Sequence, residues 1–152
     1  MTRLEGDADV WVATASGGQP HLVPLSLAWD GAHVILATPA ASPTARNAAA
    51  SGEVRLALGT SRDVTLIEAS AEVVPCADAP EPIARSYAAR TGWDPRHEDV
   101  PHVYLIVTPR TMRAWNSLAE LSGRTIMRVG QWTEATPARL PVRASSGACL
   151  ER

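Results

Sequence analysis

The first third of the chain alternates short apolar runs with tight turns, which constrains it to a small antiparallel β structure. Residues 9–15 are apolar and β-branched, and residues 16–19 (Ser-Gly-Gly-Gln) have the composition of a turn. Residues 20–29 form a second apolar run that ends in Asp-Gly at residues 30–31, and an Asp-Gly pair between apolar runs favours a hairpin. Because a third run, residues 33–38, follows at once, we expect three consecutive antiparallel strands.

A short helix is predicted after the third strand. Ser42 suits the N-cap, and Pro43 suits the first helical position, where a missing N–H has no cost. The free amides of the first turn, the helix dipole and the hydroxyls of Ser42 and Thr44 can hold a phosphate, with Arg46 or Arg55 as the source of positive charge. An ordinary N-cap on a surface helix explains the same residues, and the local sequence alone favours that simpler interpretation.

The chain then returns to the strand pattern. Residues 53–58 alternate apolar and polar side chains, and residues 64–74 form a long β-branched run that we expect to bend near residues 69–70. Residues 78–91 change to helical spacing, and Gly92 supplies a C-terminal stop. These features predict a helix between strands.

The last patterned segment is a further strand with a weaker continuation. Residues 102–108 are apolar and β-branched, residues 109–110 (Pro-Arg) predict a turn, and residues 112–115 continue extended. Residues 118–127 are compatible with a helical turn before Gly123 and a strand after it. Many short strands, few helices and close turns are typical of a small antiparallel barrel.

Length and composition indicate one domain. A chain of 152 residues, 45% of them hydrophobic, can build a single core. We assign this domain to residues 1–135, because beyond Trp132 the chain becomes rich in Pro, Ala, Ser and Arg without periodicity. Residues 136–152 are therefore predicted to be a flexible tail.

Charge and hydropathy exclude several classes of protein. A net charge of -2 without a basic stripe argues against a nucleic-acid partner. No run of about 18 apolar residues occurs, so no membrane association is expected, and without a leader-like segment we expect the protein in the cytoplasm. The 14 positions held by lysine or arginine are all arginine, which excludes a lysine Schiff base and a Walker phosphate loop.

Neither a metal site nor a hydrolase centre is predicted. Cys76 and Cys149 are isolated, and His33, His97 and His102 lack the spacing of metal ligands. No signal joins a serine, a histidine and an aspartate into a catalytic triad. Hydrolysis by a hydroxyl nucleophile is therefore disfavoured.

The second strand contains a proline, Pro24, which marks an edge or an interruption because proline cannot donate to a strand ladder. Backbone groups near Val23 and Leu25 can then face a ligand such as a planar heterocycle, although a plain edge strand is an equally good interpretation. His21, at the start of the strand, is a candidate proton donor or phosphate partner. A lone histidine is more often structural.

Several short motifs follow one another in a characteristic order: Trp11-Val-Ala-Thr, Gly18-Gln-Pro-His21-Leu-Val-Pro-Leu25, Trp29-Asp-Gly31, Leu36-Ala-Thr38, residues 42–47, Val54-Arg-Leu56, Ala71-Glu-Val73, residues 109–115, Arg124 and Gly130-Gln-Trp132. This order, over about residues 9–133, resembles the pyridoxamine 5′-phosphate oxidase-like family of flavin and deazaflavin proteins. The resemblance implies a mainly β fold, a six-stranded antiparallel split β-barrel with a few flanking helices.

The resemblance also implies a function and an assembly. It implies a homodimer with FMN or coenzyme F420 in a groove at the subunit interface, and hydride or two-electron transfer with an unidentified small-molecule substrate. The implied cofactor residues are His21, Leu22, Val23, Pro24 and Leu25 along the ring, Thr38 near the ring or ribityl chain, Ser42, Thr44, Arg46 and Asn47 at the phosphate with Arg55 as a further cation, and Trp115 and Arg124 from the partner subunit. Tyr87 and Arg90 lie on the helix that can help to hold substrate. No catalytic acid or base is identified.

One position departs from the family pattern. Where the family usually has a basic residue, often Arg-Lys or a single Lys, this chain has Pro43-Thr44, so Arg46 or Arg55 would have to supply the charge. The choice among FMN, F420 and no cofactor therefore stays open. The alternative function is a non-catalytic protein that binds a flavin or another planar ligand in the same groove.

Overall fold

A computed structural model describes residues 3–117 and 120–133. The strands in these ranges are β1 (Asp9–Ser16), β2 (Gln19–Trp29), β3 (Val34–Pro39), β4 (Glu53–Thr60), β5 (Asp63–Pro75), β6 (His102–Trp115), β7 (Thr125–Arg128) and β8 (Gln131–Trp132). The helices are α1 (Arg3–Gly6), α2 (Pro43–Ser51) and α3 (Glu81–Thr91), with short 3-10 turns η1 (Cys76–Asp78) and η2 (Pro95–His97).

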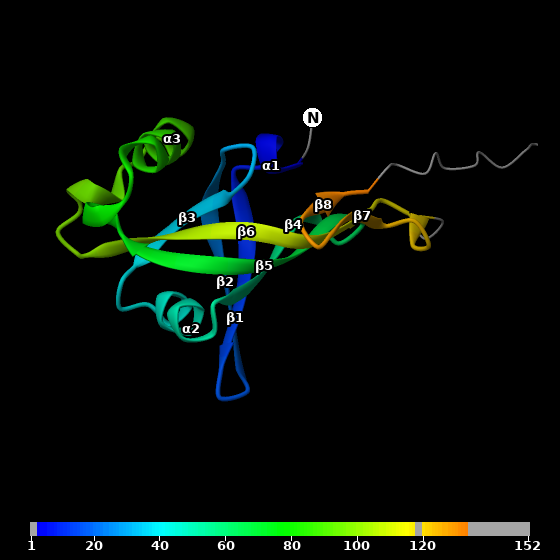
Figure 1. Ribbon diagram of the computed structural model, residues 1–152, viewed down its shortest axis with the longest axis horizontal. Coiled ribbons are helices and arrows are strands. Elements are labelled where there is room, and N and C mark those ends of the chain that lie inside the picture. The colour runs from blue at the N-terminus through cyan, green and yellow to red at the C-terminus, as the bar shows by residue number, and fades with distance from the viewer. Residues whose placement is uncertain (1–2, 118–119, 134–152) are drawn as a thin grey trace, which may run out of the picture.

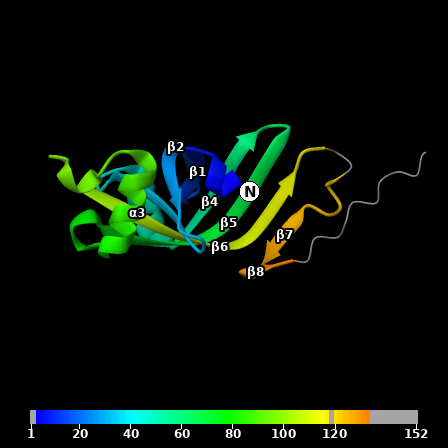
Figure 2. The same cartoon turned by 90° about the horizontal axis from the view of Figure 1, so that it is seen from above.

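The strands form one antiparallel sheet in the order β3-β2-β1-β4-β5-β6-β7-β8. A further pairing between β3 and β6 closes the first six strands into a barrel (Figure 1). The predicted mainly β, six-stranded antiparallel split barrel is confirmed. The hairpin β7–β8 leaves the barrel beside the end of β6 (Figure 2).

Alternation of side chains along each strand explains how the sequence fills this barrel. In β1, Val10, Val12 and Thr14 are buried, whereas Trp11 and the residues between them face outward. The same period buries alternate residues of β4. The interior of the barrel is filled mainly by Val, Leu, Ile and Ala side chains. None of the helices in the described residues is long and apolar enough to cross a membrane.

The pairing of β2 with its two neighbours determines where the barrel is split. β2 pairs with β1 through residues 19–26, but with β3 only through residues 27–29. Within the described residues, the stretch 19–26 therefore has one edge without a paired strand, because β3 turns away to pair with β6. Pro24 lies in this stretch, which confirms the expectation of an edge.

The pairing of β5 is irregular where a bend was predicted, and the predicted turn at residues 109–110 is wrong. The pairing of β5 with β6 shifts register between Glu68 and Ala69, opposite Pro109. This irregularity accommodates a residue without an N–H inside a continuous strand, so β6 does not turn there.

The helices begin and end largely where their capping residues predict. α2 is capped by Ser42 and ends at Gly52, which has a positive φ of 68°. α3 begins at Glu81 rather than at Asp78, because residues 76–78 form the separate turn η1, and Gly92 ends it as expected. The predicted tail, residues 136–152, lies outside the described residues.

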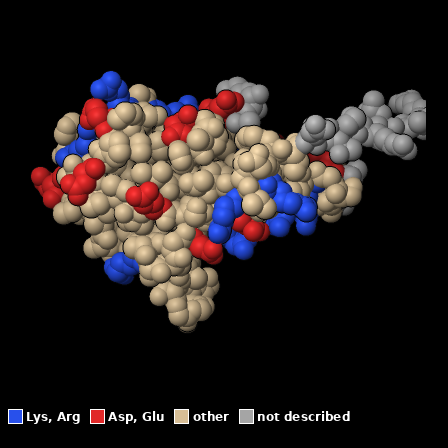
Figure 3. All heavy atoms as spheres, viewed as in Figure 1, with Lys and Arg blue, Asp and Glu red and all other residues tan. Residues whose placement is uncertain are grey.

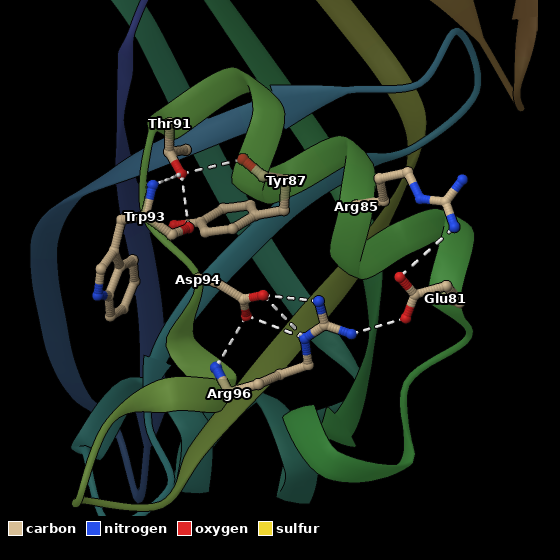
Figure 4. Close-up of polar contacts among 7 residues, drawn as sticks. All are labelled: Glu81, Arg85, Tyr87, Thr91, Trp93, Asp94 and Arg96. Carbon is tan, nitrogen blue, oxygen red and sulfur yellow. Dashed lines mark hydrogen bonds and ion pairs between the residues drawn. The ribbon is translucent and has the colours of Figure 1, made fainter.

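An ion-pair network fixes α3 to the chain that follows it. Arg96 of η2 binds the Asp94 carboxylate at 2.6 to 3.1 Å and reaches Glu81 at 2.7 Å (Figure 4). Hydrogen bonding from Arg96 lowers the pKa of Asp94 to about 2. Beneath the helix, a second apolar cluster contains Cys76, Tyr87 and Tyr104.

Candidate functional site

The unpaired edge of β2 offers main-chain hydrogen-bonding groups. Leu27 N–H donates to the carbonyl of Ala8 on the β1 side (3.0 Å), whereas the Ser26 carbonyl faces the other side and accepts from Tyr87 Oη (3.5 Å). Because the peptide groups of an antiparallel strand alternate between its two edges, Leu22 and Pro24 share the orientation of Ser26. The N–H of Leu22 and the carbonyls of Leu22 and Pro24 therefore face the unpaired edge.

This geometry corrects the prediction that main-chain groups of Val23 and Leu25 face a ligand. The same alternation turns the main-chain groups of Val23 and Leu25 toward β1, where their partners in register are Val12 and Val10. The groups available to a ligand belong to the neighbouring residues. The side chain of His21 is half-buried, and His21 lies opposite Thr14 in β1.

The Ser42 hydroxyl, predicted to hold a phosphate, lies at the start of α2 beside Thr38, the residue predicted near the ring or ribityl chain. Thr38, buried at the end of β3, donates through Oγ1 to Ser42 Oγ (3.0 Å), and Ser42 Oγ accepts from Ala45 N–H (3.1 Å). Thr44 is only 1% exposed, so its side chain is enclosed. Two donors remain at this helix end, the Ser42 hydroxyl proton and the Thr44 N–H, which has no hydrogen-bond partner among the described residues.

The two candidate cations lie in different places. The Arg46 guanidinium hydrogen-bonds the carbonyl of Ala41, which precedes α2, so its charge lies at the N-terminal end of the helix. Arg55 instead pairs with Glu68 on the outside of the barrel, with Nη1 and Oε1 separated by 2.7 Å. Of the two arginines, Arg46 is the one placed beside Ser42 and Thr44.

Asn47 has a positioning role within the fold. Its Nδ2 donates to Thr14 Oγ1 at 3.1 Å and so ties α2 to β1. Since α2 also carries Ser42 at its cap, this bond fixes the helix end relative to the barrel.

The two residues predicted to hold substrate are engaged inside the fold. Tyr87 is 1% exposed, and burial raises the pKa of its hydroxyl to about 12. Arg90 donates through Nη2 to the carbonyls of Glu5, Gly6 and Asp7 at 3.0 to 3.3 Å, which caps the end of α1. Both side chains already make structural contacts.

Trp115 and Arg124 contact each other but lie away from the edge of β2. The Arg124 guanidinium carbon is 5.2 Å from the centre of a Trp115 ring, a cation–π contact. Trp115 pairs with Val64 near the end of β6, whereas β6 pairs with β3, the neighbour of β2, only through residues 102–107. A single chain therefore does not bring this pair to the β2 edge.

Sequence reasoning missed a hollow on the outer face of the barrel. It has a volume of ≈ 330 Å³, and Thr14, Pro20, Ser51, Arg55 and Arg110 are among the residues that line it. Two ion pairs cross it, Arg55 with Glu68 and Arg110 with Glu53. The only sequence feature that could have indicated this hollow was the presence of opposite charges at outward positions of the predicted strands.

Residues 3–116, more than half of the chain, match the pyridoxamine 5′-phosphate oxidase family. The chain belongs to this family. No curated protein sequence matches the chain.

Solved structures similar to this one share the family fold. A candidate pyridoxamine 5′-phosphate oxidase from Listeria innocua has a TM-score of 0.62 at 18% identity and covers 76% of this chain and 94% of its own. An F420 reductase has a TM-score of 0.54 at 19% identity, with 69% of this chain and 88% of its own covered. An FAD-binding protein from Mesorhizobium loti has a TM-score of 0.53 at 18% identity, with 72% and 84% covered.

Proposed function

We propose that this protein is an oxidoreductase that binds a flavin or deazaflavin ring along the unpaired edge of β2. The observation that carries the proposal is the set of free main-chain groups at Leu22 and Pro24, which suits the hydrogen-bonding edge of a planar heterocycle. Membership of the family supports it, as do the similar F420 reductase and FAD-binding protein.

The residues at the start of α2 fit the phosphate group of such a cofactor. The Thr44 N–H and the Ser42 hydroxyl supply neutral donors, and Arg46 supplies the positive charge that Pro43-Thr44 lacks. FMN and F420 both carry a phosphate, so these contacts do not choose between them. When bound, the cofactor supplies the hydride or two-electron chemistry, and the protein orients it.

We also propose that the protein acts as a homodimer. Trp115 and Arg124 form a cation–π pair near the end of β6, beyond residues 102–107, the part of β6 that pairs with β3 beside β2. A second copy can present its own Trp115 and Arg124 to the unpaired edge of β2 and so complete the groove. The proposed cofactor then lies at the subunit interface.

A second candidate function is binding of a flavin or another planar ligand without catalysis. It is favoured by the engagement of Tyr87 and Arg90 in the fold, since neither side chain is free to hold a substrate. The two functions differ in whether a reduced, bound cofactor is reoxidised by a small molecule.

Equilibrium titration of the purified protein with FMN and with F420, followed by absorbance and fluorescence, tests the proposal. We expect micromolar or tighter binding of at least one of them. The bound cofactor is then reduced without oxygen and mixed with candidate acceptors, and reoxidation faster than that of the free cofactor identifies an enzyme. Tight binding without such acceleration favours the binding protein, and binding of neither cofactor contradicts the oxidoreductase.

A further inference from the structure

Aromatic side chains form a continuous series of contacts at α3. The ring of Tyr87 meets that of Tyr104 edge to face, with centres 5.4 Å apart. It meets the ring of Trp93 in the same manner at 6.2 Å (Figure 4). Tyr87 and Tyr104 are buried, whereas Trp93 is half-buried. Because tyrosine and tryptophan are among the most easily oxidised side chains, rings in contact can pass an electron from the surface to the interior.

The buried part of this series contacts the strand proposed to hold the cofactor ring. Tyr87 Oη donates to the carbonyl of Ser26 at 3.5 Å. Ser26 ends the stretch 19–26 of β2, one edge of which has no paired strand within the described residues. The free main-chain groups of Pro24, two residues earlier, have the same orientation. An oxidant bound along this edge therefore lies next to Tyr87.

The half-buried end of the series, unlike the buried rings, has a base. An oxidised tyrosine or tryptophan is a strong acid, so its radical persists where the proton has an acceptor. Trp93 Nε1 donates to Glu98 Oε1 at 2.6 Å, a bond to a carboxylate. The acceptor of Tyr87 is a neutral carbonyl, and the buried Tyr104 hydroxyl has no hydrogen-bond partner among the residues that the structure describes. Loss of an electron is therefore most favourable at Trp93.

The charge of the loop after α3 favours the same residue. Residues 93–101 include three acidic residues and one arginine. Acidic side chains are prominent at this end of the molecule, on the left in Figure 3. Negative charge beside a ring stabilises the cation that forms when the ring loses an electron.

We propose that Tyr87 and Trp93 form an electron-transfer route between the β2 edge and the surface at Glu98. A one-electron oxidant at the edge takes an electron from Trp93 by way of the Tyr87 ring. Trp93 loses its Nε1 proton to Glu98, which leaves a neutral indolyl radical and a carboxylic acid. A thiol in solution then restores Trp93 by giving it a hydrogen atom, and Glu98 releases its proton to water. The role of this route rests on the proposed function, because the oxidant there is the bound flavin after it absorbs light.

A photo-oxidant attached at Ser26 tests the route without any flavin. Ser26 is exposed, and Ser26→Cys combined with Cys149→Ser gives one accessible thiol, because Cys76 is buried. This thiol is labelled with a ruthenium tris-bipyridyl complex. A laser flash in the presence of a dissolved electron acceptor converts the label to Ru(III), which removes one electron from the protein. We expect the transient absorption of a neutral tryptophanyl radical.

Three further substitutions in the labelled protein identify the route. Trp93→Phe and Tyr87→Phe should each abolish the tryptophanyl signal, because phenylalanine is far harder to oxidise. Glu98→Gln keeps an acceptor for the indole N–H but removes the base, so the spectrum should change to that of the indole radical cation. Trp132→Phe, at an exposed tryptophan of the hairpin β7–β8, is the matched control and should leave the signal unchanged.

A labelled protein that forms no tryptophanyl radical overturns the inference, as does a radical that survives either Trp93→Phe or Tyr87→Phe. Trp11, which lies opposite Pro24 in β1, is the competing electron donor. A signal that is lost in Trp11→Phe and kept in Trp93→Phe therefore also contradicts the route. Circular dichroism establishes that each variant is folded, and Glu98→Gln decides if Trp93→Phe is not.

Flavin titration of the unlabelled protein is read separately. A protein that binds neither FMN nor F420 but forms the radical at Trp93 supports the route while the proposed function fails. A protein that binds FMN but forms no radical at Trp93 keeps the proposed function and overturns the route.

Discussion

Two of the helices that contact β2, α2 and α3, differ in what they leave free. At the start of α2, the Ser42 hydroxyl, the Thr44 N–H and the Arg46 charge point to a place where an anion can be held. At α3, the polar side chains bind one another: Glu81 holds Arg96 and Arg85, and Thr91 donates to the carbonyls of Tyr87 and Trp93 (Figure 4). The fold thus uses one helix to prepare a ligand site and the other to cover a core.

The largest effect that tests this contrast is a loss of stability at α3. Tyr87→Ala removes a ring that packs against Trp93 and Tyr104, with ring centres 6.2 and 5.4 Å apart. We expect the free energy of unfolding to fall by about 3–5 kcal/mol, measured by urea denaturation. Tyr87→Phe keeps the packing and loses only the hydroxyl, which contacts the main chain of Ser26 and Ala37, so it should cost about 1 kcal/mol. A similar, small loss for both variants would show that α3 does not cover a core.

The opposite effect is expected at α2, where a substitution should change binding and leave stability alone. Arg46→Gln removes the proposed phosphate cation, so FMN should bind roughly tenfold more weakly or worse, as expected for a lost charge-assisted hydrogen bond. Riboflavin, which lacks the phosphate, should bind as before. The measurement is a fluorescence titration with both ligands.

Arg85→Gln is the matched control for Arg46→Gln, because Arg85 is an exposed arginine on α3. It should change neither affinity. If Arg46→Gln weakened FMN and riboflavin equally, the loss would come from the ring site or from the fold, and Arg46 would have no role at the phosphate.

The smallest effect is a dependence of stability on pH that arises at α3. The pKa of Asp94 is about 2 in the folded protein, because Arg96 hydrogen-bonds its carboxylate, against about 3.9 in an unfolded chain. A lowered folded pKa stabilises the protein above the unfolded pKa, and this contribution is lost as the pH falls toward 2. Between about pH 4 and pH 2, the melting temperature of the unmodified protein should therefore fall by more than that of Asp94→Asn. Parallel melting curves for the two proteins would contradict the pairing.

Most of the fold could be predicted from the sequence, because its signals are local. The Asp-Gly pair at residues 30–31, the alternation in residues 53–58 and the Ser42-Pro43 start of α2 each depend on a few neighbouring residues. The mistake at Pro109-Arg110 has a physical reason. A proline reads as a turn in the sequence, but a register shift in a long strand pair accommodates it without a turn.

The site was harder to predict, because its decisive features depend on pairing between distant strands. Pro24 indicated an edge, but only the alternation of peptide groups against β1 identifies Leu22 and Pro24 as the residues with free groups. The sequence likewise offered Arg46 and Arg55 as equal candidates for the phosphate cation. In the structure the Arg46 guanidinium lies at the start of α2, whereas that of Arg55 pairs with Glu68.

The most direct test of the β2 edge compares the flavin affinities of Leu22→Pro and Leu22→Ala. Both variants lose the leucine side chain, but only Leu22→Pro loses the N–H that faces the unpaired edge, and Pro24 shows that β2 tolerates proline in this orientation. We predict that Leu22→Pro binds FMN or F420 about tenfold more weakly than Leu22→Ala, with similar thermal stability. Equal affinities of the two folded variants would contradict recognition of the ring by the main chain of β2.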